Sequence, residues 1–159
     1  NAGITRDATL RRMEANQWQD VISTNLDSAF NTSKQCFNGM LEQNYGRIIN
    51  ISSINGEKGQ LGQANYSAAK AGIHGFTMAV AQEGARKGVT VNTISPGYIA
   101  TDMIMAMKEE IRESVRKQIP VGRFGTPEDI ARIVVFLADE KSGFITGANI
   151  SANGGQFIH

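Results

Sequence analysis

The sequence is poor in the features that mark several classes of protein. Its single cysteine, Cys36, cannot form an internal disulfide, which fits a reducing compartment such as the cytoplasm. No stretch is apolar for long enough to cross a bilayer, and the first residues do not show the basic-then-apolar pattern of a secretory leader. The 16 basic and 15 acidic residues nearly balance, and no charge pattern points to nucleic acid or to an anionic membrane.

The remaining composition is that of one globular domain. The 159 residues are 41% hydrophobic and 19% charged, which is typical of a soluble domain with a core of its own. The chain starts with "NAGITRD" and has no initiator methionine. We therefore expect residues 1–159 to form a single, partial domain that begins upstream.

Segments with the character of buried strands alternate with longer helical segments. Residues 47–53 and 88–97 are rich in β-branched residues, and residues 145–155 are a weaker third candidate. Helical patterns cover residues 18–42 and 65–87, and Thr126 followed by Pro127 predicts the start of another helix. The Met-rich, charged residues 102–118 predict a mobile amphipathic helix. This order indicates an α/β fold with a parallel sheet and crossover helices.

Polar residues with catalytic potential follow the first predicted strand. In parallel sheets ligands bind beyond the carboxyl ends of the strands, here next to residues 53–56 and 96–101. Ser53 stands at the end of the first strand, and Tyr66 and Lys70 begin the next helix after a glycine-containing loop. Ser52 is the rival hydroxyl, but neighbouring strand residues face opposite sides, so we expect one serine to point into the site.

A serine, a tyrosine and a lysine at one point can transfer a proton to a carbonyl oxygen. The reference pKa of tyrosine is about 10, and a nearby lysine cation favours the phenolate and lowers that pKa. The serine hydroxyl can polarise the same carbonyl, but no member of the group supplies a hydride, so a reduction needs a nicotinamide cofactor. The alternative is an ordinary tyrosine–lysine pair on a helix surface, because residues four apart share a helix face.

The order of several short motifs favours the catalytic interpretation. They are "NAG" (residues 1–3), "TNL" (24–26), "NISS" (50–53), "YSAAK" (66–70), "SPGYIATDM" (95–103), "GRFGTPEDIA" (122–131) and "TGANISANGG" (146–155). Each is unspecific alone, but together and in this order they are highly specific. The chain thereby resembles the short-chain dehydrogenase/reductase family over nearly its whole length. This resemblance implies a Rossmann-like, doubly wound parallel sheet and an oxidoreductase.

The resemblance implies a role for each residue of the site. Tyr66 would protonate the substrate carbonyl, and Ser53 would orient and polarise it. Lys70 would lower the Tyr66 pKa and hydrogen-bond the nicotinamide ribose. Asn25 would kink the long helix and hold a water that links Lys70 to solvent. The alternative for Asn25 is a purely structural interruption of the helix, since asparagine is a poor helix former.

The resemblance also implies two further cofactor contacts and no metal ion. The segment beside the adenine and its ribose comprises Asn1, Ala2 and Gly3, which would equally fit a plain turn. The loop beside the nicotinamide amide and the phosphates comprises Pro96, Gly97, Ile99 and Thr101. Its Pro-Gly pair also serves to end the strand.

Within the family, "NGEKGQLGQANYS" and "PGYIATDM" are most similar to the acetoacetyl-CoA reductases. Those enzymes reduce a 3-oxoacyl-CoA to the (3R)-3-hydroxyacyl-CoA, usually with NADPH, for polyhydroxybutyrate biosynthesis. Besides Ser53 and Tyr66, the residues expected to shape the acyl pocket are Gln60, Leu61, Gln63 and Tyr98. Each of these four would also fit a polar loop with a packed aromatic. The runner-up is 3-oxoacyl-[acyl-carrier-protein] reductase, whose acidic carrier would need a basic docking face such as Arg86 and Lys87 offer.

The family pattern begins with a strand, a glycine-rich turn and a helix that hold the pyrophosphate, and no such glycine cluster precedes residue 1. We therefore expect the carboxyl-terminal portion of a longer enzyme, with the choice between NAD and NADP encoded upstream. The expectation that NADPH is the cofactor therefore follows only from the resemblance to the family. The complete enzyme is expected to be a cytoplasmic homotetramer that binds neither nucleic acid nor membrane. A different interpretation is a non-catalytic fragment that only packs against partners.

Overall fold

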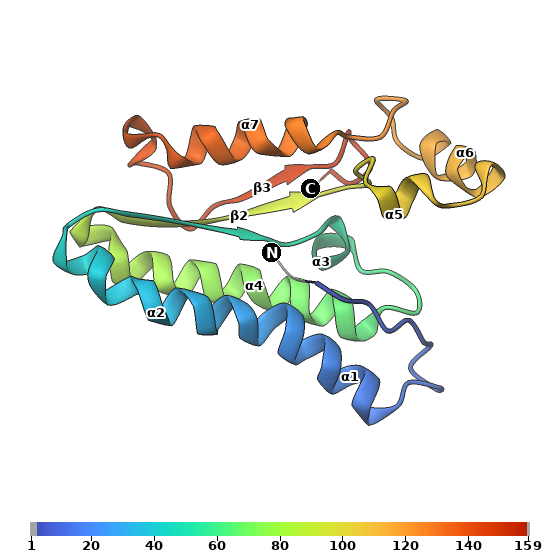
Figure 1. Cartoon of the computed structure of the whole chain (residues 1–159), viewed down its shortest axis with the longest axis horizontal. Coiled ribbons are helices and arrows are strands. Elements are labelled where there is room, and N and C mark those ends of the chain that lie inside the picture. Colours follow the sequence, from blue (N-terminus) through green and yellow to red (C-terminus); the bar gives the residue numbers. More distant parts are fainter. Residues whose placement is uncertain (1–2, 159) are drawn as a thin grey trace.

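The computed structural model describes residues 3–158, so Asn1 and Ala2 of the predicted cofactor segment lie outside the described residues. Strands β1 (Gly46–Ile51), β2 (Val89–Pro96) and β3 (Asn149–Ala152) form a parallel sheet in the order β1-β2-β3. Helices α2 (Ser28–Glu42) and α4 (Ala64–Gly84) lie along one face, and α7 (Pro127–Ala138) lies along the other (Figure 1). This is the predicted α/β fold, and a parallel sheet between two helical layers is Rossmann-like.

The shorter helices lie at the ends of these elements. Helix α1 (Ala15–Ile22) continues through a π-helical turn (Ser23–Asp27) into α2. Helix α3 (Ile54–Lys58) follows β1, whereas α5 (Asp102–Met105) and α6 (Glu109–Lys117) follow β2. Short 3₁₀ turns cover Ala85–Lys87 and Glu140–Ser142. None of the helices within residues 3–158 has both the length and the apolar character that a membrane span requires.

The central strand β2 is the most buried element. Val89, Val91 and Ile94 have no exposed surface, because β2 is paired on both edges and covered on both faces. Val91 packs with Ile48 of β1 and Ala81 of α4 in the core. Burial on both faces explains why β2 reads as a continuous run and not as an alternating pattern.

Polar groups also fix α4 over the sheet. The Thr77 hydroxyl on α4 accepts a hydrogen bond of 2.8 Å from Thr93 Oγ1 on β2 and one of 2.9 Å from Asn50 Nδ2 on β1. Thr77 and Thr93 are almost fully buried, so these bonds restrict how α4 can slide along the strands. The first turns of α4, which carry Tyr66 and Lys70, are thereby held at the carboxyl ends of β1 and β2.

The structure corrects several predicted boundaries. The helix expected over residues 18–42 begins at Ala15 and is divided by the π-helical turn, and the one expected over residues 102–118 is two helices. Residues 54–58 form α3 where a loop was expected, and the third strand covers only Asn149–Ala152. The predicted start at Thr126 is confirmed, because Thr126 Oγ1 accepts from the Asp129 amide at 3.2 Å and the Asp129 carboxylate accepts from the Thr126 amide at 2.9 Å.

Candidate active site

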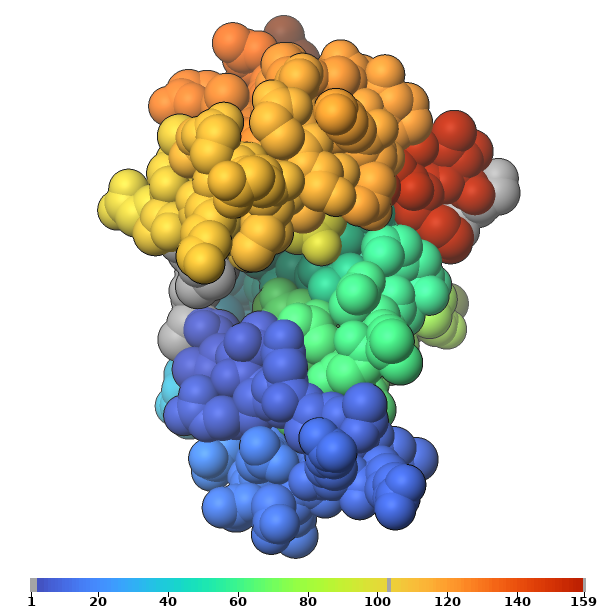
Figure 2. Space-filling view, turned by 90° about the vertical axis from the view of Figure 1, so that its right-hand side faces the viewer, coloured from blue at the N-terminus to red at the C-terminus, as the bar shows by residue number. Residues whose placement is uncertain are grey.

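A cavity of about 280 Å³ lies at the carboxyl ends of β1 and β2. Figure 2 looks onto this end of the molecule and shows a recess between the segment that follows β2, in yellow and orange, and the blue and green segments below it. The predicted residues that line the cavity are Ser53, Gln63, Tyr66, Gly97, Tyr98, Ile99 and Thr101. The other lining residues, to which the sequence analysis gave no individual role, are Thr5, Ile54, Asn55 and Ile104, and two of them lie in the predicted ligand segment 53–56. The location is the one expected for a ligand site in a parallel sheet.

The two serines after β1 face different surroundings. Ser52 is buried, and its hydroxyl donates a hydrogen bond of 2.8 Å to the carbonyl oxygen of Lys70. Ser53 lines the cavity instead and caps α3, since its Oγ accepts a hydrogen bond of 3.1 Å from the amide of Asn55. The cavity is therefore lined by Ser53 and not by Ser52, and the alternation of side chains predicts that only one of the two points into it.

Tyr66 lines the same cavity from the first turn of α4. Burial raises the pKa of the Tyr66 phenol above its ordinary value, a hydrogen bond with Ser53 offsets part of this, and the negative charge of Asp7 adds to the rise. The Tyr66 pKa is therefore raised and not lowered, so the lowering expected from Lys70 is not the net result in this structure. The Lys70 Nζ lies 5.7 Å from the centre of the Tyr66 ring and is hydrogen-bonded elsewhere, so burial outweighs it.

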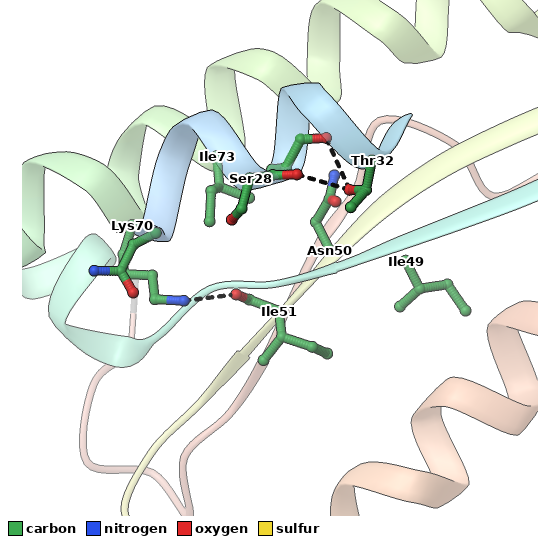
Figure 3. A pocket seen from close by; sticks show the side chains of 9 residues that line it. Ser28, Thr32, Ile49, Asn50, Ile51, Lys70 and Ile73 are labelled. Carbon is green, nitrogen blue, oxygen red and sulfur yellow. Dashed lines mark hydrogen bonds between the residues drawn. The ribbon is translucent and has the colours of Figure 1, made fainter. Parts of the chain in front are cut away.

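Lys70 is held at the end of β1. Its Nζ donates a hydrogen bond of 2.9 Å to the carbonyl oxygen of Ile51, as Figure 3 shows. The side chain is buried, and this burial lowers the pKa of the Lys70 ammonium. Gly56 on α3 packs directly on the Lys70 backbone, where a Cβ would lie 2.8 Å from the Lys70 carbonyl carbon. A larger residue at position 56 would therefore push α3, and with it Ser53, away from α4.

A second cavity of about 260 Å³ lies beside Lys70 and is lined by side chains from α2, β1 and α4 (Figure 3). Asn25, in the π-helical turn, also lines it. The Asn25 amide accepts from the Ile4 nitrogen at 3.1 Å and donates to the carbonyl oxygens of Ile4 at 2.9 Å and of Val21 at 3.0 Å. The predicted helix distortion at Asn25 is thus present and has a structural cause. The water between Asn25 and Lys70 stays a prediction, and this cavity is where it would lie.

Only some of the predicted cofactor residues within the described chain line the first cavity. Gly97, Ile99 and Thr101 line it, Pro96 ends β2 beside them, and Gly3 lies next to the Asn25 side chain. The Asn55 Oδ1 is buried and has no hydrogen-bond partner among residues 3–158, as expected where the polar end of a ligand completes the site. The site therefore fits the nicotinamide end of a dinucleotide. No group of three or more His, Cys, Asp or Glu side chains in the described residues is placed to hold a metal ion.

The residues predicted to contact the substrate separate into two groups. Gln63 and Tyr98 line the cavity, whereas Gln60 and Leu61 do not, and Leu61 is 90% exposed. The loop turns at Gly59 and Gly62, whose positive φ angles of 71° and 80° direct the residues between them outward. A substrate contact from Gln60 or Leu61 would need a ligand that extends beyond this cavity.

Gln63 is fixed by two residues that sequence reasoning missed. Its amide accepts a hydrogen bond of 2.9 Å from Asn55 Nδ2 and donates one of 2.9 Å to the Asp7 carboxylate. Asp7 lies 56 positions away in the sequence, and no periodicity connects the two residues. No predicted motif includes Asp7, and the nearby motif "NAG" pointed to the cofactor and not to Gln63.

Comparison with known proteins finds relatives that are similar over nearly the whole chain. The family model described as "Enoyl-(Acyl carrier protein) reductase" matches residues 1–156. The acetoacetyl-CoA reductase of Allochromatium vinosum is 60% identical over 158 residues, and that of Cupriavidus necator is 59% identical over 155. These alignments cover 99% and 98% of this chain but 64% and 63% of the relatives. The 3-oxoacyl-[acyl-carrier-protein] reductase of Vibrio cholerae is 49% identical over 158 residues, which are 99% of this chain and 65% of that protein. The chain thus spans slightly less than two thirds of the length of the curated relatives it matches.

Proposed function

Because the chain belongs to the short-chain dehydrogenase/reductase family, we propose that the full-length protein reduces acetoacetyl-CoA to the (3R)-3-hydroxyacyl-CoA with NADPH. The observation that carries the proposal is that Ser53 and Tyr66 line one cavity at the carboxyl ends of β1 and β2, with the Lys70 ammonium 5.7 Å from the centre of the Tyr66 ring. The choice of substrate is supported by relatives named acetoacetyl-CoA reductase at 59% and 60% identity.

The chemistry assigned to the cavity is a proton transfer to the substrate carbonyl. Tyr66 would donate its phenolic proton to the carbonyl oxygen, and its raised pKa keeps that proton in place near neutrality. Ser53 would donate its single hydroxyl proton in a second hydrogen bond to the same carbonyl oxygen and polarise the carbonyl. NADPH, when bound, supplies the hydride that reduces the carbonyl carbon.

Lys70 would act on the Tyr66 phenolate that the proton transfer leaves behind. Once Tyr66 has given up its proton, the Lys70 ammonium stabilises the phenolate, and its bond to Ile51 holds it within the site. The cavity that Lys70 shares with Asn25 offers a path by which solvent could return the proton. This assignment makes Asn25 both a helix anchor and one wall of the proton path.

The alternative substrate is a 3-oxoacyl group on the acyl-carrier protein. The catalytic group is the same for both carriers, and the lower identity of 49% with a reductase of that name favours CoA. Steady-state rates of the full-length protein with acetoacetyl-CoA and with the acetoacetyl-carrier protein would separate the two. A higher kcat/KM for the carrier-protein substrate would overturn the CoA assignment.

The direct test is NADPH oxidation by the purified full-length protein in the presence of acetoacetyl-CoA. We expect substrate-dependent turnover, slower turnover with NADH, and a product of (3R) configuration. The absence of turnover with either nucleotide and either carrier would overturn the proposal. It would favour the alternative of a non-catalytic subunit.

We further propose that the full-length protein is a homotetramer in the cytoplasm. Large apolar side chains that are exposed on two helices and a loop support the assembly, since burial in an interface would remove them from water. They are Phe30 on α2, Val135 and Phe136 on α7, and Phe144, which are 54%, 70%, 52% and 102% exposed. Light scattering of the full-length protein would measure the mass, and a monomer would contradict the assembly.

A further inference from the structure

The carboxylate of Glu57 joins α3 to the edge strand β3. Its Oε1 accepts a hydrogen bond of 2.7 Å from Asn149 Nδ2 and another from the Ser151 hydroxyl. Asn149 and Ser151 are two positions apart on β3, so their side chains leave the same face of the sheet. Both donors therefore meet a single carboxylate oxygen, and because that oxygen carries charge the two bonds are of the stronger kind.

Ser53 depends on how α3 is placed. Ser53 is the N-cap residue of α3, with its Oγ bonded to the amide of Asn55 and its carbonyl oxygen accepting from the amide of Gly56 at 2.9 Å. Helix α3 has only five residues, so it cannot be stable through its own hydrogen bonds. Its position must come from contacts with other elements, and Glu57 lies one turn after Ser53.

The bonds at Glu57 continue to the helix that carries Tyr66. A carboxylate only accepts, so Asn149 must present its NH₂ group to Glu57 and its Oδ1 to the hydroxyl of Ser95, at 2.8 Å. The Ser95 hydroxyl donates its only proton to Asn149. In its contact with His74 Nε2, at 3.2 Å, the Ser95 oxygen therefore accepts the hydrogen bond. His74 lies on α4, one turn beyond Lys70. A directional chain of hydrogen bonds thus connects α4, β2, β3 and α3.

We propose that Glu57 is a positioning residue for Ser53 in the reaction proposed above, on which this inference rests. Glu57 does not line the cavity, and it acts by holding α3 so that the Ser53 hydroxyl points at the substrate carbonyl. The polarising bond from Ser53 matters most in the transition state, where charge develops on the carbonyl oxygen. Loss of the restraint should therefore lower kcat and leave KM nearly unchanged.

The test uses the full-length protein with Glu57→Ala and Glu57→Gln. Because a displaced catalytic group is costly, we expect kcat with acetoacetyl-CoA and NADPH to fall by about tenfold in Glu57→Ala. Glutamine keeps an acceptor oxygen at the same place, so Glu57→Gln should restore most of kcat. The matched control is Glu42→Ala at the exposed end of α2, which removes a carboxylate far from the cavity and should leave kcat unchanged.

A double variant separates positioning from general damage. If Glu57 acts through Ser53, Glu57→Ala should have little further effect once Ser53→Ala is present. Equal loss of kcat in both backgrounds, or wild-type kcat in Glu57→Ala, would overturn the proposal. If Glu57→Ala fails to fold, Ser151→Ala removes only one of the two donors to Glu57. Its effect on kcat can then be compared with and without Ser53→Ala.

A second readout does not require turnover. Hydrogen exchange of the Asn55 and Gly56 amides, which are bonded to Ser53, should be faster in Glu57→Ala than in the wild type and in Glu42→Ala. Unchanged exchange would contradict the restraint even in an active enzyme. An inactive wild type would refute the proposed function, whereas faster exchange in Glu57→Ala would still report the restraint.

Discussion

The ammonium of Lys70 is hydrogen-bonded at 2.9 Å to the carbonyl oxygen of Ile51, the last residue of β1. This bond joins the first turns of α4 to the end of the strand that leads to Ser53. A buried charged donor that loses its acceptor is costly, so the two elements that carry the serine and the tyrosine cannot easily separate. The contact that stabilises this part of the fold also sets the geometry of the candidate site.

Replacement of Tyr66 by phenylalanine removes only the hydroxyl. General acid catalysis typically contributes about 10²- to 10⁴-fold, and we expect kcat to fall by about that factor while the free energy of unfolding stays nearly the same. Steady-state kinetics and thermal unfolding of the full-length protein measure both. Tyr45→Phe, at an exposed tyrosine before β1, is the matched control and should keep kcat. Near-normal turnover of Tyr66→Phe would remove the acid role.

A methyl group at Gly56 should disturb the site through packing. A Cβ there would lie 2.8 Å from the Lys70 carbonyl carbon and 2.9 Å from the Lys70 Cβ. We expect Gly56→Ala to lower the free energy of unfolding by about 1–3 kcal/mol and to lower kcat, because α3 must move.

The control for this change is Gly39→Ala on α2. No atom lies within 4 Å of a Cβ at that position, and alanine is a better helix former by up to about 1 kcal/mol. Gly39→Ala should therefore keep or raise the stability that denaturant unfolding measures. Equal behaviour of the two variants would show that α3 and α4 are not closely packed.

Removal of the Asn25 amide should cost stability. Its hydrogen bonds to Ile4 and Val21 are buried or partly buried, and the backbone groups of Ile4 would lose their partner. We expect Asn25→Ala to destabilise the protein by about 1–3 kcal/mol in denaturant unfolding. Asn38→Ala, at an exposed position on α2, should change the stability by less than about 0.5 kcal/mol. A neutral Asn25→Ala would mean that these bonds do not hold residues 3–8 in place.

Asp129 should make stability fall in acid. Its hydrogen bond with Arg123, together with that from the Thr126 amide, lowers the pKa of the carboxyl from 3.8 to about 2. A pKa that is lower in the folded state contributes stability above the unfolded value, and this contribution is lost as the pH falls from 3.8 towards 2. Urea unfolding of Asp129→Asn should depend less on pH in this window than the wild type does. An Asp129→Asn variant with the same pH dependence as the wild type would contradict this assignment.

Local patterns in the sequence determined the type of most elements and the central residues of the site. The β-branched runs predicted β1 and β2, because a strand covered on both faces needs apolar residues at every position. The start of α7 was predictable from Thr126 and Pro127, because the signal for a helix start lies in adjacent residues. The alternation of side chains predicted that only one of Ser52 and Ser53 points into the site, since that depends only on strand geometry.

Contacts between distant segments decided the rest. The π-helical turn arises because Asn25 bonds to Ile4, 21 positions away, and α3 exists because Gly56 packs on Lys70 and Glu57 reaches Asn149. The sign of the Tyr66 pKa shift also came from the fold, since burial outweighs a lysine whose ammonium is bonded to Ile51. Periodicity reports only neighbours along one element, so the sequence determined which groups take part, and tertiary packing decided their orientation and protonation.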